Sequence, residues 1–103
     1  MALKTVMLLS SGIEITNGYS LISTCLCRYI EPKSVEITLN VYKDKSSFDA
    51  KKPEVIQLKY KCTGSDYYLY FDESVLIENN STILQEAYFW LSLMDIHSEY
   101  VEV

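Results

Sequence analysis

The chain has 103 residues, of which 49% are hydrophobic and 22% charged, with only three Gly and two Pro. This composition is typical of one globular domain and argues against a linker, a low-complexity segment or a disordered chain. The net charge of −5 is unevenly distributed, because residues 1–61 contain all nine bases and residues 62–103 contain eight acids and no base. Such a balance argues against a nucleic-acid-binding protein, which needs a strongly basic face.

The charge split has two interpretations. It suits head-to-tail packing between copies, in which one end of a subunit attracts the opposite end of the next. It is also explained by a solvated acidic surface, which we favour because charge asymmetry concerns solubility and association more than fold.

The cysteines and the hydropathy pattern bear on compartment and cofactors. Cys25 and Cys27 lie two apart on a predicted strand, too far apart for an easy disulfide, and Cys-x-Cys with a single His matches no zinc pattern. We therefore expect free, buried thiols in a reducing compartment, and no metal. Met1 to Lys4 lacks the apolar core of a signal peptide, and no apolar run approaches the roughly 20 residues that span a bilayer. The expected site of synthesis is the cytoplasm, without a membrane partner.

The first third of the chain predicts strands. Residues 3–10 predict a first strand, Ser11-Gly12 a turn, and residues 13–16 a short partner strand. Asn17-Gly18 predicts a two-residue hairpin turn, followed by a long strand over residues 19–30. In strict alternation this strand has Leu21, Cys25, Cys27 and Tyr29 on one face and Ile22, Leu26 and Ile30 on the other. Both faces are therefore expected to be partly covered.

The clearest pattern runs from Val35 to Cys62 and predicts two antiparallel strands on either side of a charged loop. Apolar side chains alternate at positions 35, 37, 39 and 41, and again at 56, 58, 60 and 62. We expect this pair at the centre of a sheet. The loop between Lys43 and Pro53 predicts a short helical turn over residues 46–52, capped by Ser46 or Ser47. Phe48 is expected to pack back onto the sheet, and would be a contact residue if it were exposed.

The last third predicts one more strand and a helix. Residues 67–72 alternate as a strand that would place Tyr68 and Tyr70 on an open sheet face, and residues 72–80 predict a polar connection. Residues 82–94 predict a helix that begins with a Thr82–Gln85 capping box. Its apolar stripe, which packs on the sheet, comprises Ile83, Ala87, Trp90, Leu91 and Met94, widened by Leu84 and Tyr88, whereas Phe89 looks outward.

Together these elements predict a single β-rich domain over residues 1–103. Its class is α+β, with an antiparallel sheet of about five to six strands packed by one C-terminal helix at about 82–94. Residues 95–103 form a short tail, in which residues 100–103 predict an edge strand that pairs within the domain or onto another chain.

The residues suggest no chemistry. The single histidine, His97, lies in the tail near Asp95 and Glu99 and is expected to be an ordinary surface residue. The adjacent acids Asp72 and Glu73 are expected to be solvated. There is no Gly-rich phosphate loop, metal spacing, dinucleotide fingerprint or internal repeat. We therefore expect no catalytic residue, cofactor or small-molecule substrate.

Two segments carry a family resemblance. The strand–charged loop–strand segment over residues 37–60 resembles small proteins encoded in late structural operons of tailed bacteriophages and prophages. Ile83-Leu-Gln-Glu-Ala-Tyr-Phe-Trp-Leu91 resembles their terminal helix, and Val101-Glu102-Val103 resembles their acidic-valine ending. The chain departs from them at Met94-Asp95-Ile96-His97, where they often have a Pro-Glu-Phe-like corner, and in the Cys25-x-Cys27 strand.

The resemblance implies a non-enzymatic virion component of the tail, baseplate or neck that contacts other virion proteins and copies of itself. The alternative is a small acidic phage-encoded inhibitor or adaptor that binds a host protein. If the chain is a virion component, the Lys43–Glu54 loop and the acidic C-terminal third are expected at subunit contacts. The candidate contact residues are Phe48, Lys51, Lys52, Tyr68, Tyr70, Phe89 and Tyr100.

Overall fold

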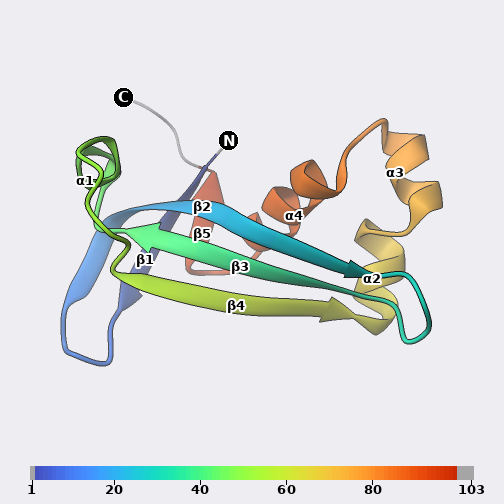
Figure 1. Cartoon of the computed structure of the whole chain (residues 1–103), viewed down its shortest axis with the longest axis horizontal. Helices are drawn as coiled ribbons and strands as arrows, with labels where there is room; N and C mark the ends of the chain where they lie inside the picture. Colours follow the sequence, from blue (N-terminus) through green and yellow to red (C-terminus); the bar gives the residue numbers. More distant parts are fainter. Residues whose placement is uncertain (1, 100–103) are drawn as a thin grey trace.

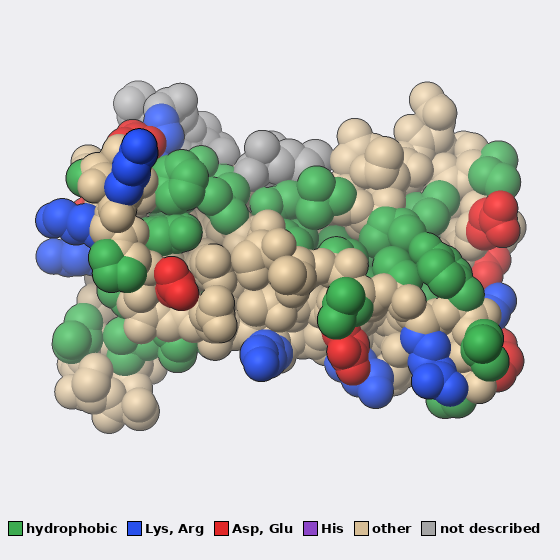
Figure 2. Space-filling view, viewed as in Figure 1, with side chains coloured by type: hydrophobic (Ala, Val, Ile, Leu, Met, Phe, Trp, Pro, Cys, Tyr) green, Lys and Arg blue, Asp and Glu red, His purple; other side chains and the backbone are tan. Residues whose placement is uncertain are grey.

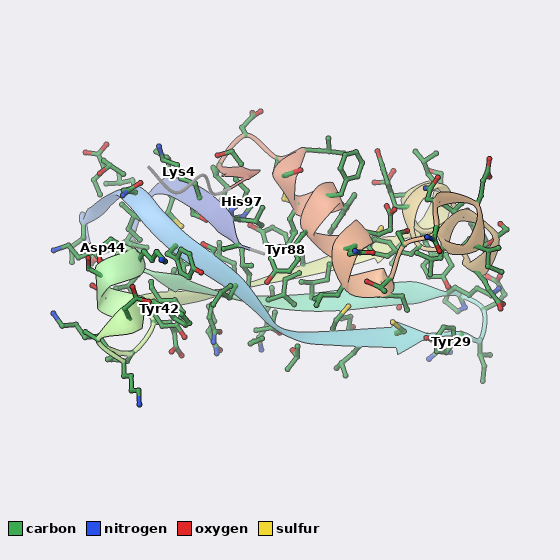
Figure 3. All side chains as sticks on the ribbon, turned by 90° about the horizontal axis from the view of Figure 1, so that it is seen from above. Lys4, Tyr29, Tyr42, Asp44, Tyr88 and His97 are labelled. Carbon is green, nitrogen blue, oxygen red and sulfur yellow. The ribbon has the colours of Figure 1, made fainter. Side chains whose placement is uncertain are left out.

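The structure is an α+β fold with one five-stranded antiparallel sheet, as predicted. This computed structural model describes residues 2–99, and its strand order is β4-β3-β2-β1-β5. The strands are β1 Leu3–Leu8, β2 Glu14–Arg28, β3 Ser34–Tyr42, β4 Ile56–Thr63 and β5 His97–Glu99. The helices are α1 Lys45–Asp49, α2 Gly64–Tyr70, α3 Glu73–Asn79 and α4 Ile83–Ser92. In Figures 1 and 3, α2, α3 and α4 lie on one side of the sheet, and we call them the helix layer.

The long strand β2 joins two parts of the sheet that run in different directions (Figure 1). Its first half pairs with β1, and the residues from Tyr19 onward pair with β3. The β2–β3 register shifts between Ile22 and Thr24, which marks a bulge that bends the strand. The shift places Ile22 on the same face as Cys25 and Cys27, because their partners are Leu39, Ile37 and Val35. The prediction that Ile22 and Cys25 lie on opposite faces was therefore wrong.

The predicted hairpin turn at Asn17-Gly18 was also wrong, because both residues lie inside β2. Gly18 pairs with Thr5 of β1, and a Cβ atom at Gly18 would lie 2.8 Å from the Thr5 carbonyl oxygen. Glycine is needed here for close approach of two backbones rather than for a turn. The turn lies earlier, where Gly12 has φ +89° and donates its N–H to the Leu9 carbonyl at 2.9 Å.

The β3–β4 pair is antiparallel, as predicted, and its register places Val35 opposite Cys62 and Val41 opposite Ile56. The inward residues of β3 form the centre of the core: Val35, Ile37, Leu39 and Val41 are each at most 1% exposed. The predicted central position of the pair was wrong, however, because β4 is an edge strand. The strand is half-buried at Ile56, Leu58 and Tyr60 because it has a neighbour on one side only.

The predicted helical turn in the charged loop is α1. Asp44, rather than Ser46 or Ser47, caps it by accepting the Ser47 N–H at 2.7 Å. This hydrogen bond lowers the pKa of the Asp44 carboxyl. Phe48 packs between Tyr19 and Tyr42, with ring centroids 5.1 and 5.0 Å away, so its predicted packing against the sheet is confirmed.

Two predictions for the segment after β4 were wrong. Residues 67–72 do not form a strand, since α2 covers Gly64–Tyr70, and the predicted polar connection contains α3. Tyr67 and Phe71, four residues apart, are 3% and 2% exposed, whereas Leu69 between them is 60% exposed. That spacing fits one face of a helix. Tyr68 and Tyr70 therefore lie in the helix layer rather than on an open sheet face.

The C-terminal helix has the predicted capping box. Thr82 accepts the Gln85 N–H at 3.2 Å, and the Gln85 side chain accepts the Thr82 N–H at 2.9 Å. The buried residues of α4 are Ala87, Tyr88 and Leu91. Tyr88 is more central than predicted, since its hydroxyl accepts the Ile22 N–H at 3.0 Å beside the β2 bulge, whereas Leu84 is 48% exposed. One helix does not cover the sheet alone, because α2 contributes Tyr67 and Phe71 to the same core.

The end of the described chain pairs within the domain. Strand β5 is antiparallel to β1, with His97 opposite Thr5 and Leu3 opposite Glu99. The edge strand predicted for residues 100–103 lies outside the described residues, and so does Tyr100.

The packing predicts different costs for two leucines of α4. Leu91 is fully buried and Leu84 is 48% exposed. Leu91→Ala should lower the free energy of unfolding by about 2–5 kcal/mol, because it opens a cavity under the helix. Leu84→Ala should change it by less than about 1 kcal/mol. Urea unfolding followed by circular dichroism measures both. Equal losses in the two variants would contradict the packing described here.

Candidate interaction surface

An apolar patch lies on the outer surface of the helix layer. Leu69 of α2 is 60% exposed, Phe89 of α4 is 53% exposed, and Leu93, one turn after Phe89, is 55% exposed. The Tyr70 ring lies 6.1 Å from the Phe89 ring, centroid to centroid. A shallow hollow between the two helices is lined by Leu69, Tyr70, Phe89, Asn79 and Glu86. We call Leu69, Tyr70, Phe89 and Leu93 the apolar patch.

The patch brings together two of the predicted contact residues, Tyr70 and Phe89. Leu69 and Leu93 were not predicted, although the Phe89–Leu93 spacing of four residues on the outward side of a helix was a visible signal. A gathered set of exposed apolar side chains at the centre of a surface marks a contact site more often than scattered ones do.

The other predicted contact residues lie elsewhere. Phe48 is a half-buried residue of α1, and Lys51 and Lys52 are exposed just after that helix, where Lys51 has φ +59°. Tyr68 lies at the opposite end of the sheet, where its hydroxyl donates to the Glu31 carboxylate and Lys33 Nζ is 5.9 Å from its ring centroid. The hydrogen bond to Glu31 raises the pKa of the Tyr68 hydroxyl. The predicted contacts therefore do not form one surface.

Part of the uneven charge of the sequence is divided between the helix layer and the opposite face of the sheet. From residue 64 to residue 96 the chain runs through the helix layer and contains no Lys or Arg, and its acids are Asp66, Asp72, Glu73, Glu78, Glu86 and Asp95. The other face of β3 and β4, which we call the open face, carries Lys59 and Lys61 beside Glu36. Lys61 Nζ lies 3.7 Å from the Glu36 carboxylate. Figure 2 looks onto the open face and shows blue side chains along its lower edge, over β4.

A chain of hydrogen-bonded polar side chains, which we call the polar chain, joins the two edges of the curled sheet inside the domain. Tyr60 of β4 and His97 of β5 meet through the Tyr60 hydroxyl and His97 Nε2 at 2.7 Å. His97 Nδ1 lies 2.9 Å from Thr5 Oγ1, which lies 2.5 Å from Ser20 Oγ. Thr5 and Ser20 are 0% exposed and His97 is 3% exposed. Figure 3 shows His97 between β1 and α4.

The prediction that His97 is a surface residue was therefore wrong. A hydroxyl on either side of a neutral imidazole satisfies both ring nitrogens in either tautomer, because each hydroxyl can donate or accept. Burial lowers the pKa of His97 to about 4, since it disfavours the charged ring. The available signal was two polar residues, Thr5 and Ser20, at inward positions of apolar strands. The Thr5 and Ser20 hydroxyls are sealed from solvent. The hydrogen-bonded network of Ser20, Thr5, His97 and Tyr60 therefore has a structural role, which is to hold β1, β2, β4 and β5 together.

The three cysteines are free, with Cys62 buried and Cys25 and Cys27 half-buried. Burial raises the pKa of the Cys25 and Cys62 thiols to about 11, which makes them weak nucleophiles at neutral pH. Within residues 2–99, no three His, Cys, Asp or Glu side chains gather closely enough to hold a metal ion. In the same range no helix is long and apolar enough to cross a membrane.

Comparisons with protein-family models, with curated proteins and with solved structures found no match to this chain.

The polar chain predicts the titration of the only histidine. The His97 ring should stay neutral down to about pH 5, and its ¹³Cε1–Hε1 NMR signal should titrate near pH 4. Because the chain has one histidine, this signal is unambiguous. A midpoint near pH 6.5 would show that the ring is solvated.

The same shift predicts how stability depends on pH. The pKa of His97 is lower in the folded state than in the unfolded state, so between pH 6.5 and pH 4 only the unfolded chain takes up the proton. The neutral His97 ring therefore adds about 3 kcal/mol to the free energy of unfolding above pH 6.5, and this contribution is lost as the pH falls to 4. Urea unfolding at several pH values should show this loss in the natural chain and not in His97→Gln. Equal slopes in both chains would contradict it.

Proposed function

We propose that this chain is a non-enzymatic structural component of a tailed-phage virion, in the tail, baseplate or neck, that works through subunit contacts. The resemblance of residues 37–60 and 83–91 to late-operon phage proteins supports the phage assignment. The observation that carries the assembly role is the apolar patch on the helix layer. Its side chains lie on α2, on α4 and at the C-cap of α4, and they are about half exposed or more at Leu69, Phe89 and Leu93.

The patch suits assembly because it is shallow. The hollow beside Phe89 lies on an outward surface and is lined by two aromatic rings, a leucine and two polar side chains. Aromatic side chains of this kind, partly exposed and surrounded by polar groups, are typical anchors of protein–protein interfaces. The partners on this proposal are other virion proteins and copies of the chain itself, and the Lys43–Glu54 loop remains a predicted second contact.

A second candidate function is a small acidic inhibitor or adaptor that binds a host protein. The observation that favours it is the absence of Lys and Arg from residues 64–96, which gives the helix layer an acidic surface suited to a basic partner. Mass spectrometry of purified particles from the encoding phage or prophage separates the two. A virion component is present at a fixed copy number per particle, whereas an inhibitor is absent.

The apolar patch predicts the effect of one substitution on assembly. Phe89→Glu should fold normally, because the side chain is 53% exposed, and should reduce the chain's incorporation into particles by about tenfold or more. Ile13→Glu is the matched control: Ile13 is 60% exposed in the turn between β1 and β2, at the other end of the molecule from α2. Incorporation is measured by mass spectrometry of particles. Equal incorporation of Phe89→Glu and Ile13→Glu would contradict a contact at the patch.

A further inference from the structure

The apolar patch has an acidic border and the open face has a basic one. Glu86 lines the hollow beside Phe89, and no Lys or Arg occurs between residues 64 and 96 to balance it. On the opposite side of the sheet, Leu26 is 63% exposed and borders a shallow hollow with Lys59, Lys61, Glu36 and Thr38. Each surface thus combines exposed apolar area with charge of one predominant sign, and the two signs are opposite.

This distribution decides between two ways in which copies can meet. A two-fold dimer through the patch alone would bring Glu86 and the other acids of one helix layer against those of its partner. Like charges placed together at an interface cost free energy. Contact between a helix layer and an open face instead places Glu86 near Lys59 or Lys61 and covers the patch with the apolar side chain of Leu26.

We propose that copies of this chain associate head to tail, with the helix layer of one copy docked on the open face of the next. The proposal rests on the proposed function and adds the identity of one partner and the two surfaces. Because they lie on opposite sides of the sheet, the interface is heterologous. Successive copies then close into a ring or continue as an open stack, according to the rotation between them.

The charges provide a test by reversal. Sedimentation equilibrium of the natural chain should show self-association that weakens as NaCl is raised from about 50 to about 500 mM, because salt screens the paired charges. Glu86→Lys and Lys59→Glu should each weaken association by about tenfold, since each brings like charges together. The double variant Lys59→Glu/Glu86→Lys should recover most of the loss.

Two further variants separate the effect of the Glu86 charge from the loss of its hydrogen bond and from a change of net charge. Glu86 also accepts the Ser81 hydroxyl at 2.9 Å, so Glu86→Gln, which removes the charge and keeps an acceptor, should give an intermediate affinity. Glu14→Lys changes the net charge as much as Glu86→Lys does, at the exposed start of β2 beside the β1–β2 turn, and should leave association unchanged. Circular dichroism confirms that each variant is folded.

Several results would overturn the head-to-tail contact. Stronger association of Glu86→Gln than of the natural chain would show that patch meets patch, because removing the charge relieves repulsion between acids only in that arrangement. A natural chain that stays monomeric at millimolar concentration, or a double variant no better than either single one, would also refute it. None of these results refutes the proposed function, which is tested separately by the presence of the chain in particles and by Phe89→Glu.

Discussion

Packing of the inward face of β3 against α2 and α4 is the interaction on which the rest of the structure depends. Leu39 and Val41 on the strand and Ala87 and Leu91 on the helix are all 0% exposed. Because α2 and α4 cover only this face, and α1 covers the other face only at the Tyr19–Tyr42 end, the fold leaves two surfaces uncovered: the outside of the helix layer and the open face of β3 and β4. The apolar patch lies on the first of these surfaces, and the hollow beside Leu26 lies on the second.

The curl of the sheet adds a second constraint. Strands β4 and β5 lie at opposite ends of the strand order, yet Tyr60 and His97 are in hydrogen-bond contact. The bulge at Ile22 bends β2, and Tyr88 accepts the Ile22 N–H at that bend. A polar chain of four side chains inside an apolar core is stabilising only when its members are satisfied, and no buried side-chain nitrogen or oxygen among the described residues lacks a partner. His97 therefore holds the chain's last described strand against its first.

The sequence predicts some of these features and not others for physical reasons. The alternation of Val35, Ile37, Leu39 and Val41 extends over enough residues to identify a strand and its buried face. The alternation of Tyr67, Leu69 and Phe71 is too short to do so, because Tyr67 and Phe71 also share a helical face. A bulge such as the one at Ile22 changes which side chains of the strand point to which face of the sheet, and no pattern in the neighbouring residues indicates it. The burial of His97 depends on Thr5, Ser20 and Tyr60, which are distant in the chain and are brought together only by the curl of the sheet.

The apolar patch was predicted only in part. An exposed residue that contacts a partner is selected to fit that partner's surface, which this sequence does not describe. Phe89 was identified from helical periodicity, whereas the addition of Leu69 and Tyr70 required α2 to be recognised as a helix. The division of charge was visible from the start, but its meaning changed with the fold. The acids of residues 64–96 lie in the helix layer, whereas Lys59 and Lys61 lie on the open face.

The most direct test of this account is zero-length carbodiimide crosslinking of an equal mixture of ¹⁵N-labelled and unlabelled protein, followed by mass spectrometry. Within one copy, Glu86 and Lys59 lie on opposite sides of the sheet, so a bond between their side chains must join two copies. The account predicts peptides in which Glu86 of one isotopic form is joined to Lys59 or Lys61 of the other. Intermolecular crosslinks that leave out both the helix layer and the open face, or crosslinks only within single copies, would contradict it.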